Sequence, residues 1–395
     1  MATLTRPVLH RRQALPVQAT CLKPIVRPVS VAPAVSAAAA CRQVPVPGPA
    51  FLQPQQVGTS SRTVVTAASA ASVPQESPRA NWKLPTFILL WYAFNIIFNI
   101  INKSTLNAFP CPWFIGTWQL VASGLFMGVL WITKLHPVPQ IDAKFFAALL
   151  PVAFFHTVGH IAAVVSFSQM AVSFAHIVKS AEPVFSVALS GPLLGVWYPW
   201  YVWASLLPIV AGCSLSAMKE VSFAWSGFNN AMISNVGMVL RNIYSKKSLN
   251  DYKHIDGINL FGLISIASLL FCAPAGIYFE GSTWKGAWEA AVAKAGGSAV
   301  PVLQLLGWGG VFYHLYNQLS YMVLDCGISP VTFSVGNTMK RVAVVVSSVM
   351  FFRNPVSILN WIGSFVAIGG TYLYTVATDR YAAQKKAAAA AKKQQ

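Results

Sequence analysis

Long apolar stretches recur along this chain and constrain its fold more than any other feature. Windows of about twenty apolar residues, the length that an α-helix needs to cross a bilayer, follow one another through most of the sequence. The predicted spans cover residues 84–103, 112–134, 145–165, 171–194, 199–218, 223–245, 258–279, 301–324, 329–352 and 355–376. Charged residues make up only 10% of the chain, against about 25% in soluble domains. The sequence therefore predicts an all-α integral membrane protein with ten transmembrane helices.

The first 75 residues have the composition of a targeting leader. They contain no Asp or Glu, so that Glu76 is the first acid, and they are rich in Ala, Pro, Ser and scattered Arg. Basic, hydroxylated and acid-poor leaders are typical of organellar transit peptides. We predict that residues 1–75 are a disordered transit peptide, with cleavage within residues 64–72. Composition alone does not separate plastid from mitochondrial leaders.

Charge and cysteine patterns argue against other functional classes. The formal net charge is +18, but the basic residues lie in the leader, at span ends, in short loops and in the low-complexity tail 379–395. They do not form the basic face of a nucleic-acid-binding protein. The six cysteines are isolated and form no CxxC pair, so neither a disulfide framework nor a zinc site is indicated. We predict no metal and no cofactor.

The two halves of the membrane region resemble each other. Residues 99–107 align with residues 242–250 at an offset of 143, with five of nine positions identical, and later matches follow at an offset of 156. An odd number of spans in each copy inverts the second copy, an arrangement that transporters use for alternating access. We predict two inverted five-helix repeats, residues 84–218 and 223–376.

Cations inside two predicted spans indicate an anionic ligand. Lys179 lies in the fourth span, and Lys340 and Arg341 lie 11 and 12 residues into the ninth. A charge at the centre of a membrane helix costs at least about 2.5–3.5 kcal/mol and is usually functional. Too few acids lie nearby to cancel these charges, although Lys179 could pair with Glu182 three residues later. We predict an anion site in which arginine offers a planar fork of donors and lysine a point charge.

Two polar side chains precede the cation-bearing helices. His160 and Tyr316 are related by the 156-residue offset, and both can donate hydrogen bonds to oxygens beyond a bound phosphate. The alternative is an interior packing role for each. His156 lies one turn from His160, but without a third ligand the pair does not indicate a metal site.

Three further charged residues lie at membrane depth and are candidates for a gate or for the transport pathway. Arg241 and Lys103 lie near the ends of their spans, where the alternative is that they extend to the membrane interface. Glu182 precedes Pro183, and this pair is expected to interrupt the helix beside Lys179.

Four long segments, residues 160–190, 226–249, 312–325 and 329–356, resemble the plastidic phosphate translocators of the drug/metabolite transporter superfamily. The likeness covers residues 82–378. It implies ten helices and strict antiport of inorganic phosphate for phosphorylated C3, C5 or C6 sugars across the plastid inner envelope membrane. The leader would then be a plastid transit peptide that the import machinery recognises. The protein would be a transporter and not an enzyme.

The resemblance also implies roles for individual residues. The two lysines and the arginine that hold phosphate in that family match Lys179, Lys340 and Arg341, and the histidine and tyrosine near the carbon moiety match His160 and Tyr316. Two departures stand out: Ala163 replaces a threonine found in some members, and the connection at residues 324–330 is one residue longer than usual.

The branch of the family is indicated by shorter segments, residues 212–223, 251–262, 280–284 and 332–341. They look most like the pentose-phosphate and hexose-phosphate branches, which favours xylulose 5-phosphate or glucose 6-phosphate, with triose phosphate, as substrates. The alternative is a triose-phosphate/3-phosphoglycerate/phosphate translocator.

Other readings remain open from the sequence. The ending Lys392-Lys393-Gln394-Gln395 resembles a dilysine retrieval signal, which would suit a nucleotide-sugar transporter of the endoplasmic reticulum or Golgi. A membrane enzyme would need a catalytic carboxylate, for which Glu182 and Asp325 are the candidates. The sequence leaves the oligomeric state open, and a homodimer is compatible with it.

Overall fold

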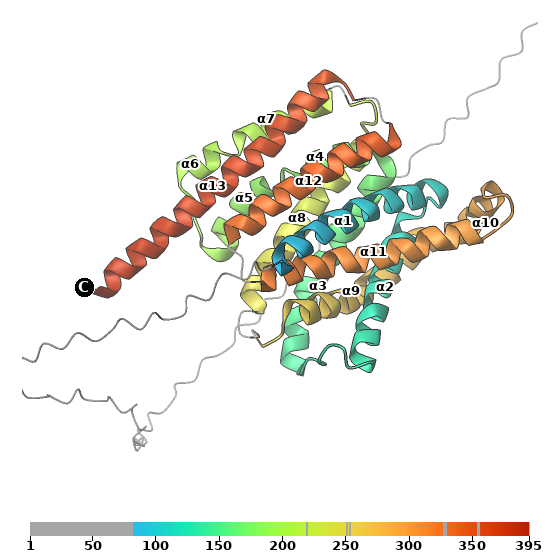
Figure 1. Cartoon of the computed structure of the whole chain (residues 1–395), viewed down its shortest axis with the longest axis horizontal. Helices are drawn as coiled ribbons and strands as arrows, with labels where there is room; N and C mark the ends of the chain where they lie inside the picture. Colours follow the sequence, from blue (N-terminus) through green and yellow to red (C-terminus); the bar gives the residue numbers. More distant parts are fainter. Residues whose placement is uncertain are drawn as a thin grey trace, which may run out of the picture. The chain divides into compact units, whose positions relative to one another are not determined.

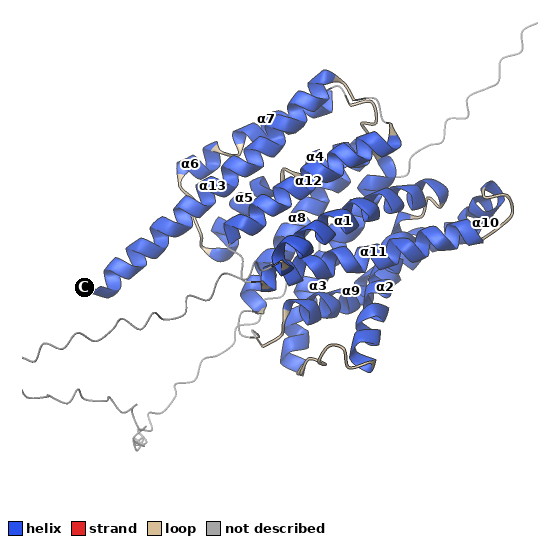
Figure 2. Cartoon of the chain, viewed as in Figure 1, coloured by secondary structure: helices blue, strands red, loops and turns tan. Residues whose placement is uncertain are grey.

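Helices make up most of the part of the chain that the computed structural model describes, residues 82–218, 220–249, 252, 254–326, 330–353 and 356–394. No strand occurs among these residues (Figure 2). The predicted transit peptide and residues 327–329 of the lengthened connection lie outside them. The elements are α1 (Lys83–Ala108), α2 (Pro112–Ile132), α3 (Ala143–Gln169), α4 (Val172–Lys179), α5 (Glu182–Leu194), α6 (Trp200–Ala204), α7 (Leu207–Met218), α8 (Trp225–Ser248), α9 (Gly257–Glu280), the 3₁₀ turn η1 (Gly281–Thr283), α10 (Trp284–Lys294), α11 (Val300–Asp325), α12 (Pro330–Phe352) and α13 (Ile358–Gln394). Figure 1 labels the α-helices.

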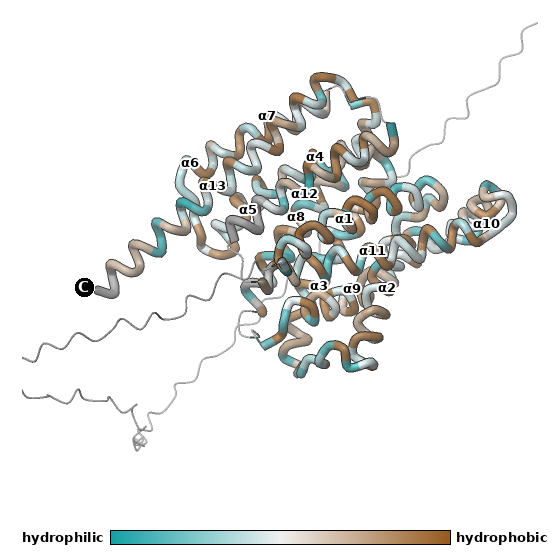
Figure 3. Tube along the Cα trace, in the orientation of Figure 1, coloured by the Kyte–Doolittle hydropathy of each residue, from teal (hydrophilic) through white to brown (hydrophobic). Residues whose placement is uncertain are grey.

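Each range predicted to span the membrane contains helix, but only five helices among the described residues are both long and apolar enough to cross a bilayer. These include α1, α2 and α3, and Figure 3 shows the hydrophobic residues along α1. One reason for the lower number is that the fourth predicted span is divided into helices of 8 and 13 residues. The all-helical class is confirmed, and the ten-span topology stays a prediction.

The interruption beside Lys179 lies where the Glu182-Pro183 pair predicts it. Helix α4 ends at Lys179, and α5 begins at Glu182 with Pro183 in its first turn. Proline is tolerated there because the first N–H groups of a helix have no partner within the helix. The break leaves the carbonyl oxygens at the end of α4 open to side chains from elsewhere in the fold.

Two segments that the sequence describes as polar connections are helical. Residues 280–300, which lie between the seventh and eighth predicted spans, contain α10, and α13 continues through the predicted tail to Gln394. Both segments are rich in Ala, Lys, Glu or Gln, residues of high helix propensity. Hydropathy alone does not detect such helices, because their composition is not apolar.

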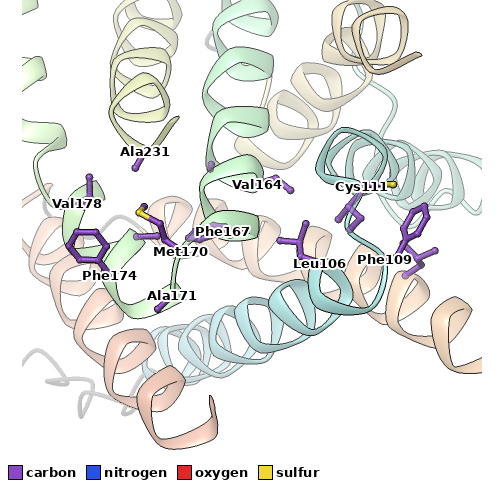
Figure 4. Close-up of a cluster of buried hydrophobic side chains, with 14 of the residues drawn as sticks. Leu106, Phe109, Cys111, Val164, Phe167, Met170, Ala171, Phe174, Val178 and Ala231 are labelled. Atoms are coloured by element: carbon purple, nitrogen blue, oxygen red, sulfur yellow. The ribbon is translucent and has the colours of Figure 1, made fainter. Parts of the chain in front are cut away.

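The helices pack in pairs that join distant parts of the chain. The most extensive packing joins α3 to α8, α7 to α13, α1 to α11 and α2 to α9. Helix α8 also packs on α5, α1 on α12, α4 on α12, α3 on α9, and α2 on α11. A buried apolar cluster lies where the ends of α1, α3 and α4 meet, with Leu106, Phe167 and Phe174 among its members (Figure 4).

Glycines allow two of these helix pairs to approach closely. A methyl group added at Gly212 of α7 would lie 2.6 Å from the carbonyl oxygen of Gly363 and 2.7 Å from the Cα atom of Ala367, both in α13. Gly159 and Gly237 play the same part between α3 and α8. Small residues at helix contacts are typical of membrane proteins, where close backbone packing replaces the hydrophobic driving force.

We therefore expect Gly212→Ala to destabilise the protein, because the added methyl group meets backbone atoms that no side-chain rotation can move. Overpacking of this kind costs about 1–3 kcal/mol, which outweighs the helix propensity gained, at most about 1 kcal/mol. The measurement is the thermal unfolding midpoint in detergent. Gly128→Ala is the matched control, since a methyl group on Gly128 of α2 meets nothing within 4 Å. Equal midpoints for the two variants would contradict this packing.

Candidate functional site

A cavity of about 170 Å³, lined by both polar and apolar side chains, lies between the helices, and its walls come from α1, α2, α3, α4, α8, α11 and α12. The sequence-predicted residues Lys179, Lys340, Arg341, His160 and Tyr316 all line it. They come from four helices that are widely separated in the chain. The fold therefore brings the predicted anion ligands and the predicted sugar ligands to one place.

Lys179 is held at the point where α4 ends. Its Nζ atom donates a hydrogen bond to Ser234 Oγ of α8 at 2.6 Å, and Ser234 Oγ donates to the carbonyl oxygen of Gly159 at 2.7 Å. Asn235 Nδ2 donates to the carbonyl oxygen of Val178 at 3.1 Å. These bonds fix the broken helix end against α8 and direct the ammonium group to the cavity wall.

Arg341 bridges the same break from α12. Its Nη1 atom donates to the carbonyl oxygen of Lys179 at 2.7 Å, and its Nη2 atom lies 2.9 Å from Glu182 Oε2. The two side chains are 20% and 26% exposed. Arg341 therefore has a carboxylate partner, but one carboxylate does not cancel three cations. Glu182 pairs with Arg341 and not with Lys179, the partner that lies three residues away in the sequence.

Lys340 contacts an aromatic ring. Its Nζ atom lies 4.6 Å from the centre of the Trp91 ring in α1, within the range of a cation–π interaction. Among the described residues, neither Lys340 nor Lys179 has a carboxylate oxygen within 4 Å. With Glu182 counted, the four groups carry a formal charge of +2 when both lysines are protonated.

His160 and Tyr316 occupy the aromatic side of the cavity. His160 Nε2 lies 3.1 Å from the carbonyl oxygen of Gly116, which can only accept, so that Nδ1 is the acceptor of the neutral ring. The ring centres of His160 and Tyr313 are 5.1 Å apart, and those of Tyr316 and Phe98 are 4.9 Å apart. Ala163, the departure noted in the sequence, also lines the cavity.

The remaining gate candidates do not line the cavity. Lys103 Nζ donates to the carbonyl oxygens of Phe167 at 2.8 Å and Met170 at 3.1 Å, where α3 ends. Arg241 contacts Asn242 Oδ1 at 2.9 Å and His156 Nδ1 at 3.4 Å. The contacts of Lys103 close a helix end, and a gating role for either residue stays a prediction.

Six polar residues of the cavity wall were not among the sequence-predicted site residues: Asn95, Asn99, Asn102, Gln119, His176 and Tyr313. A signal was present, since the three asparagines recur at i, i+4 and i+7 inside an apolar span, which places them on one helix face. Uncharged residues cost less in the membrane than cations, and for that reason they attract less attention in a sequence.

Metal binding has no support in the described part of the chain. No group of three or more His, Cys, Asp or Glu side chains is arranged there to hold an ion. The His156 and His160 rings lie 5.9 Å apart and nearly parallel, but no third His, Cys, Asp or Glu side chain of the described residues joins them.

Comparison with known proteins finds sequence similarity across the membrane region. The model of the Triose-phosphate Transporter family matches residues 82–375. The chloroplastic xylulose 5-phosphate/phosphate translocator of Arabidopsis thaliana is 58% identical over 291 residues, which cover 74% of this chain and 69% of that protein. The glucose-6-phosphate/phosphate translocator 1 of the same plant is 46% identical over 314 residues, covering 78% and 79%. The triose phosphate/phosphate translocator of Flaveria trinervia is 40% identical over 301 residues, covering 76% and 72%.

Proposed function

Because this chain belongs to the Triose-phosphate Transporter family, we propose that it exchanges inorganic phosphate for phosphorylated sugars across the plastid inner envelope membrane. The observation that carries this proposal is the gathering of Lys179, Lys340 and Arg341 around one cavity, with Glu182 as the only carboxylate paired to them among the described residues. The formal charge of +2 matches a phosphate group, which carries close to two negative charges at neutral pH.

The charge balance supports obligatory exchange. When the cavity is empty, closing it would leave its excess positive charge without a partner in a low-dielectric site, which is costly. Bound phosphate removes that excess, so that the loaded carrier can change its conformation while the empty carrier stalls. Inorganic phosphate and sugar phosphates share the phosphate group, and either one therefore supports the transition.

The ten-span fold with two inverted repeats is part of the same proposal, and helix packing supports it. The predicted spans, numbered one to ten, pack in matching pairs. Span three packs on span six, and span eight packs correspondingly on span one. In the same way, the contact of spans three and seven matches that of eight and two, and the contact of four and six matches that of nine and one. Spans two, four and five pack on seven, nine and ten. Exchanging every span with its counterpart five positions away leaves these pairs unchanged, as a two-fold axis between two copies requires.

Xylulose 5-phosphate and glucose 6-phosphate, together with triose phosphate, are the sugar substrates that we propose. The relatives named for the first two are 58% and 46% identical to this chain, against 40% for the triose phosphate relative cited above. Ala163 at the cavity wall also leaves more room for a longer carbon chain than a threonine would. A triose-phosphate translocator is the alternative function.

The proposal includes the domain order and location predicted from the sequence. Residues 1–75 would direct the chain to the plastid and be removed, residues 82–378 would form the transporter, and residues 379–395 a basic tail. The relatives cited above are described as chloroplastic, which supports this location. A homodimer remains an option for the assembled state.

Counter-substrate exchange tests the function. Liposomes that contain the protein and one unlabelled compound are supplied with labelled phosphate outside. We expect rapid uptake with internal phosphate, xylulose 5-phosphate, glucose 6-phosphate or triose phosphate, and background uptake into empty liposomes or with an internal nucleotide sugar. Equal uptake into empty liposomes would indicate a channel or uniporter and would contradict obligatory exchange. Strong exchange with the nucleotide sugar would instead favour the secretory-pathway alternative.

A further inference from the structure

The part of the cavity wall formed by α1 and α2 carries neutral amides. Asn95, Asn99 and Asn102 lie on one face of α1, Gln119 faces them from α2, and all four line the cavity. They are deeply buried, with Gln119 1% and Asn102 2% exposed. Buried amides are costly unless they form hydrogen bonds, so their presence in a membrane protein needs a reason.

The hydrogen bonds among these amides leave a specific set of donor and acceptor groups unused. Asn99 is engaged at both ends of its amide, since its Nδ2 donates to the carbonyl oxygen of Asn95 at 2.7 Å and its Oδ1 lies 2.9 Å from His176 Nε2. Gln119 Nε2 donates to Asn102 Oδ1 at 2.7 Å, but Gln119 Oε1 is buried and has no partner among the described residues. One bond between two amides leaves an acceptor on one and a donor on the other, whichever way the amides are turned.

An acceptor beside a donor is the complement of a hydroxyl group, which donates one hydrogen bond and accepts others. The unpaired acceptor does not suit the ionised oxygens of a phosphate group, because an amide oxygen can only accept and an ionised oxygen has no proton to donate. Carboxylates on this wall would also bind hydroxyls, but they would cancel the charge of Lys179, Lys340 and Arg341. Neutral amides bind hydroxyls without weakening the anion site.

We propose that Asn102 and Gln119, supported by Asn99 and His176, form the subsite that binds the hydroxyl and carbonyl oxygens of the sugar chain beyond its phosphate. The proposal rests on the proposed function, since it assigns part of the same cavity. His160 and Tyr316 contact the carbon chain from the other walls, and the Asn102–Gln119 pair selects hydroxylated substrates. The pair also explains why a buried acceptor is retained unpaired: a substrate hydroxyl satisfies it in the loaded carrier.

The test compares counter-substrates in one preparation. Gln119→Leu, Gln119→Met and Asn102→Leu are reconstituted, and labelled phosphate uptake is measured with internal phosphate, dihydroxyacetone phosphate or xylulose 5-phosphate. We expect the ratio of xylulose 5-phosphate-driven to phosphate-driven uptake to fall about tenfold in each variant, the usual size of one lost hydrogen bond to a buried group. The fall should be smaller for dihydroxyacetone phosphate, which carries fewer hydroxyls.

Gln304→Leu is the matched control, because Gln304 is an exposed residue of α11 that does not line the cavity. An unchanged ratio in all three variants would overturn the subsite. Equal loss with every counter-substrate, complete loss included, would also overturn it, because that pattern marks a structural link between α1 and α2. Failure of the proposed function would look different: the wild-type protein itself would then show no exchange dependent on internal phosphate.

Discussion

Protein in which Lys340 is replaced by alanine is expected to exchange phosphate at least about 30-fold more slowly than the wild type. Loss of one member of a buried, hydrogen-bonded charge cluster costs about 2–5 kcal/mol, and each 1.4 kcal/mol or so is a factor of ten. Lys340 has no carboxylate partner among the described residues, so we expect its charge to act on the substrate in the loaded carrier. Lys179→Ala and Arg341→Ala should have effects of similar size. The measurement is the initial rate of phosphate/phosphate exchange in liposomes.

The control for this series is Lys285→Ala, which removes the same charge from an exposed position on α10. Arg341→Lys adds a second comparison, because it keeps the charge and loses the planar fork that can bind two oxygens at once. We expect Lys285→Ala to exchange at the wild-type rate and Arg341→Lys to fall between wild type and Arg341→Ala. Wild-type exchange in any of the three alanine variants would remove that residue from the anion site.

The apolar windows predicted the helix positions because a long apolar run has few other ways to bury its backbone in a membrane. The search for apolar windows does not detect α10 or the extension of α13, because these helices form through helix propensity and carry polar residues. It also does not distinguish a continuous span from one divided into α4 and α5. That distinction depended on Pro183, a local stereochemical signal.

The cations of the site were predictable because each is costly where it lies, and a cost without a structural reason indicates a function. The pairing of Arg341 with Glu182 was not predictable in the same way. The two residues are 159 positions apart, and only the packing of α12 against the broken helix brings them together. The neighbour in the sequence, Lys179, instead turns toward Ser234 on α8.

The amide side chains that line the cavity on α1 and α2 were also not predicted from the sequence, and the reason is physical. An asparagine row inside an apolar span is compatible with hydrogen bonds along the helix itself, and Asn99 does bond to the carbonyl oxygen four residues earlier. The amides that hydrogen-bond within the helix can be distinguished from the amides that face a ligand only once the position of the cavity is known. Gln119 carried no signal of its own until the fold placed it opposite Asn102.

Glu182→Gln is expected to change which anions the carrier prefers. With both lysines protonated, the three cations and Glu182 of the wild type carry a formal net charge of +2, which a bound phosphate group would neutralise. The glutamine variant carries +3 and should bind phosphate more tightly, because Arg341 is no longer engaged by a carboxylate. It should also turn over more slowly with phosphate, by about tenfold, because the loaded site retains an uncompensated charge that is costly to enclose.

A substrate with one more negative charge should reverse this loss. 3-Phosphoglycerate adds a carboxylate to the phosphate group. Its negative charge therefore balances the net charge of +3 at the site of the glutamine variant and exceeds the net charge of +2 at the site of the wild type. We therefore expect the ratio of 3-phosphoglycerate exchange to phosphate exchange to rise in Glu182→Gln and to stay constant in Glu289→Gln, the same substitution at an exposed position of α10. If Glu182 instead serves only the first turn of α5, where an acidic side chain stabilises the helix dipole, the thermal midpoint would fall and the ratio would not move. A constant ratio with unchanged phosphate affinity would thus reject charge matching as the basis of the exchange.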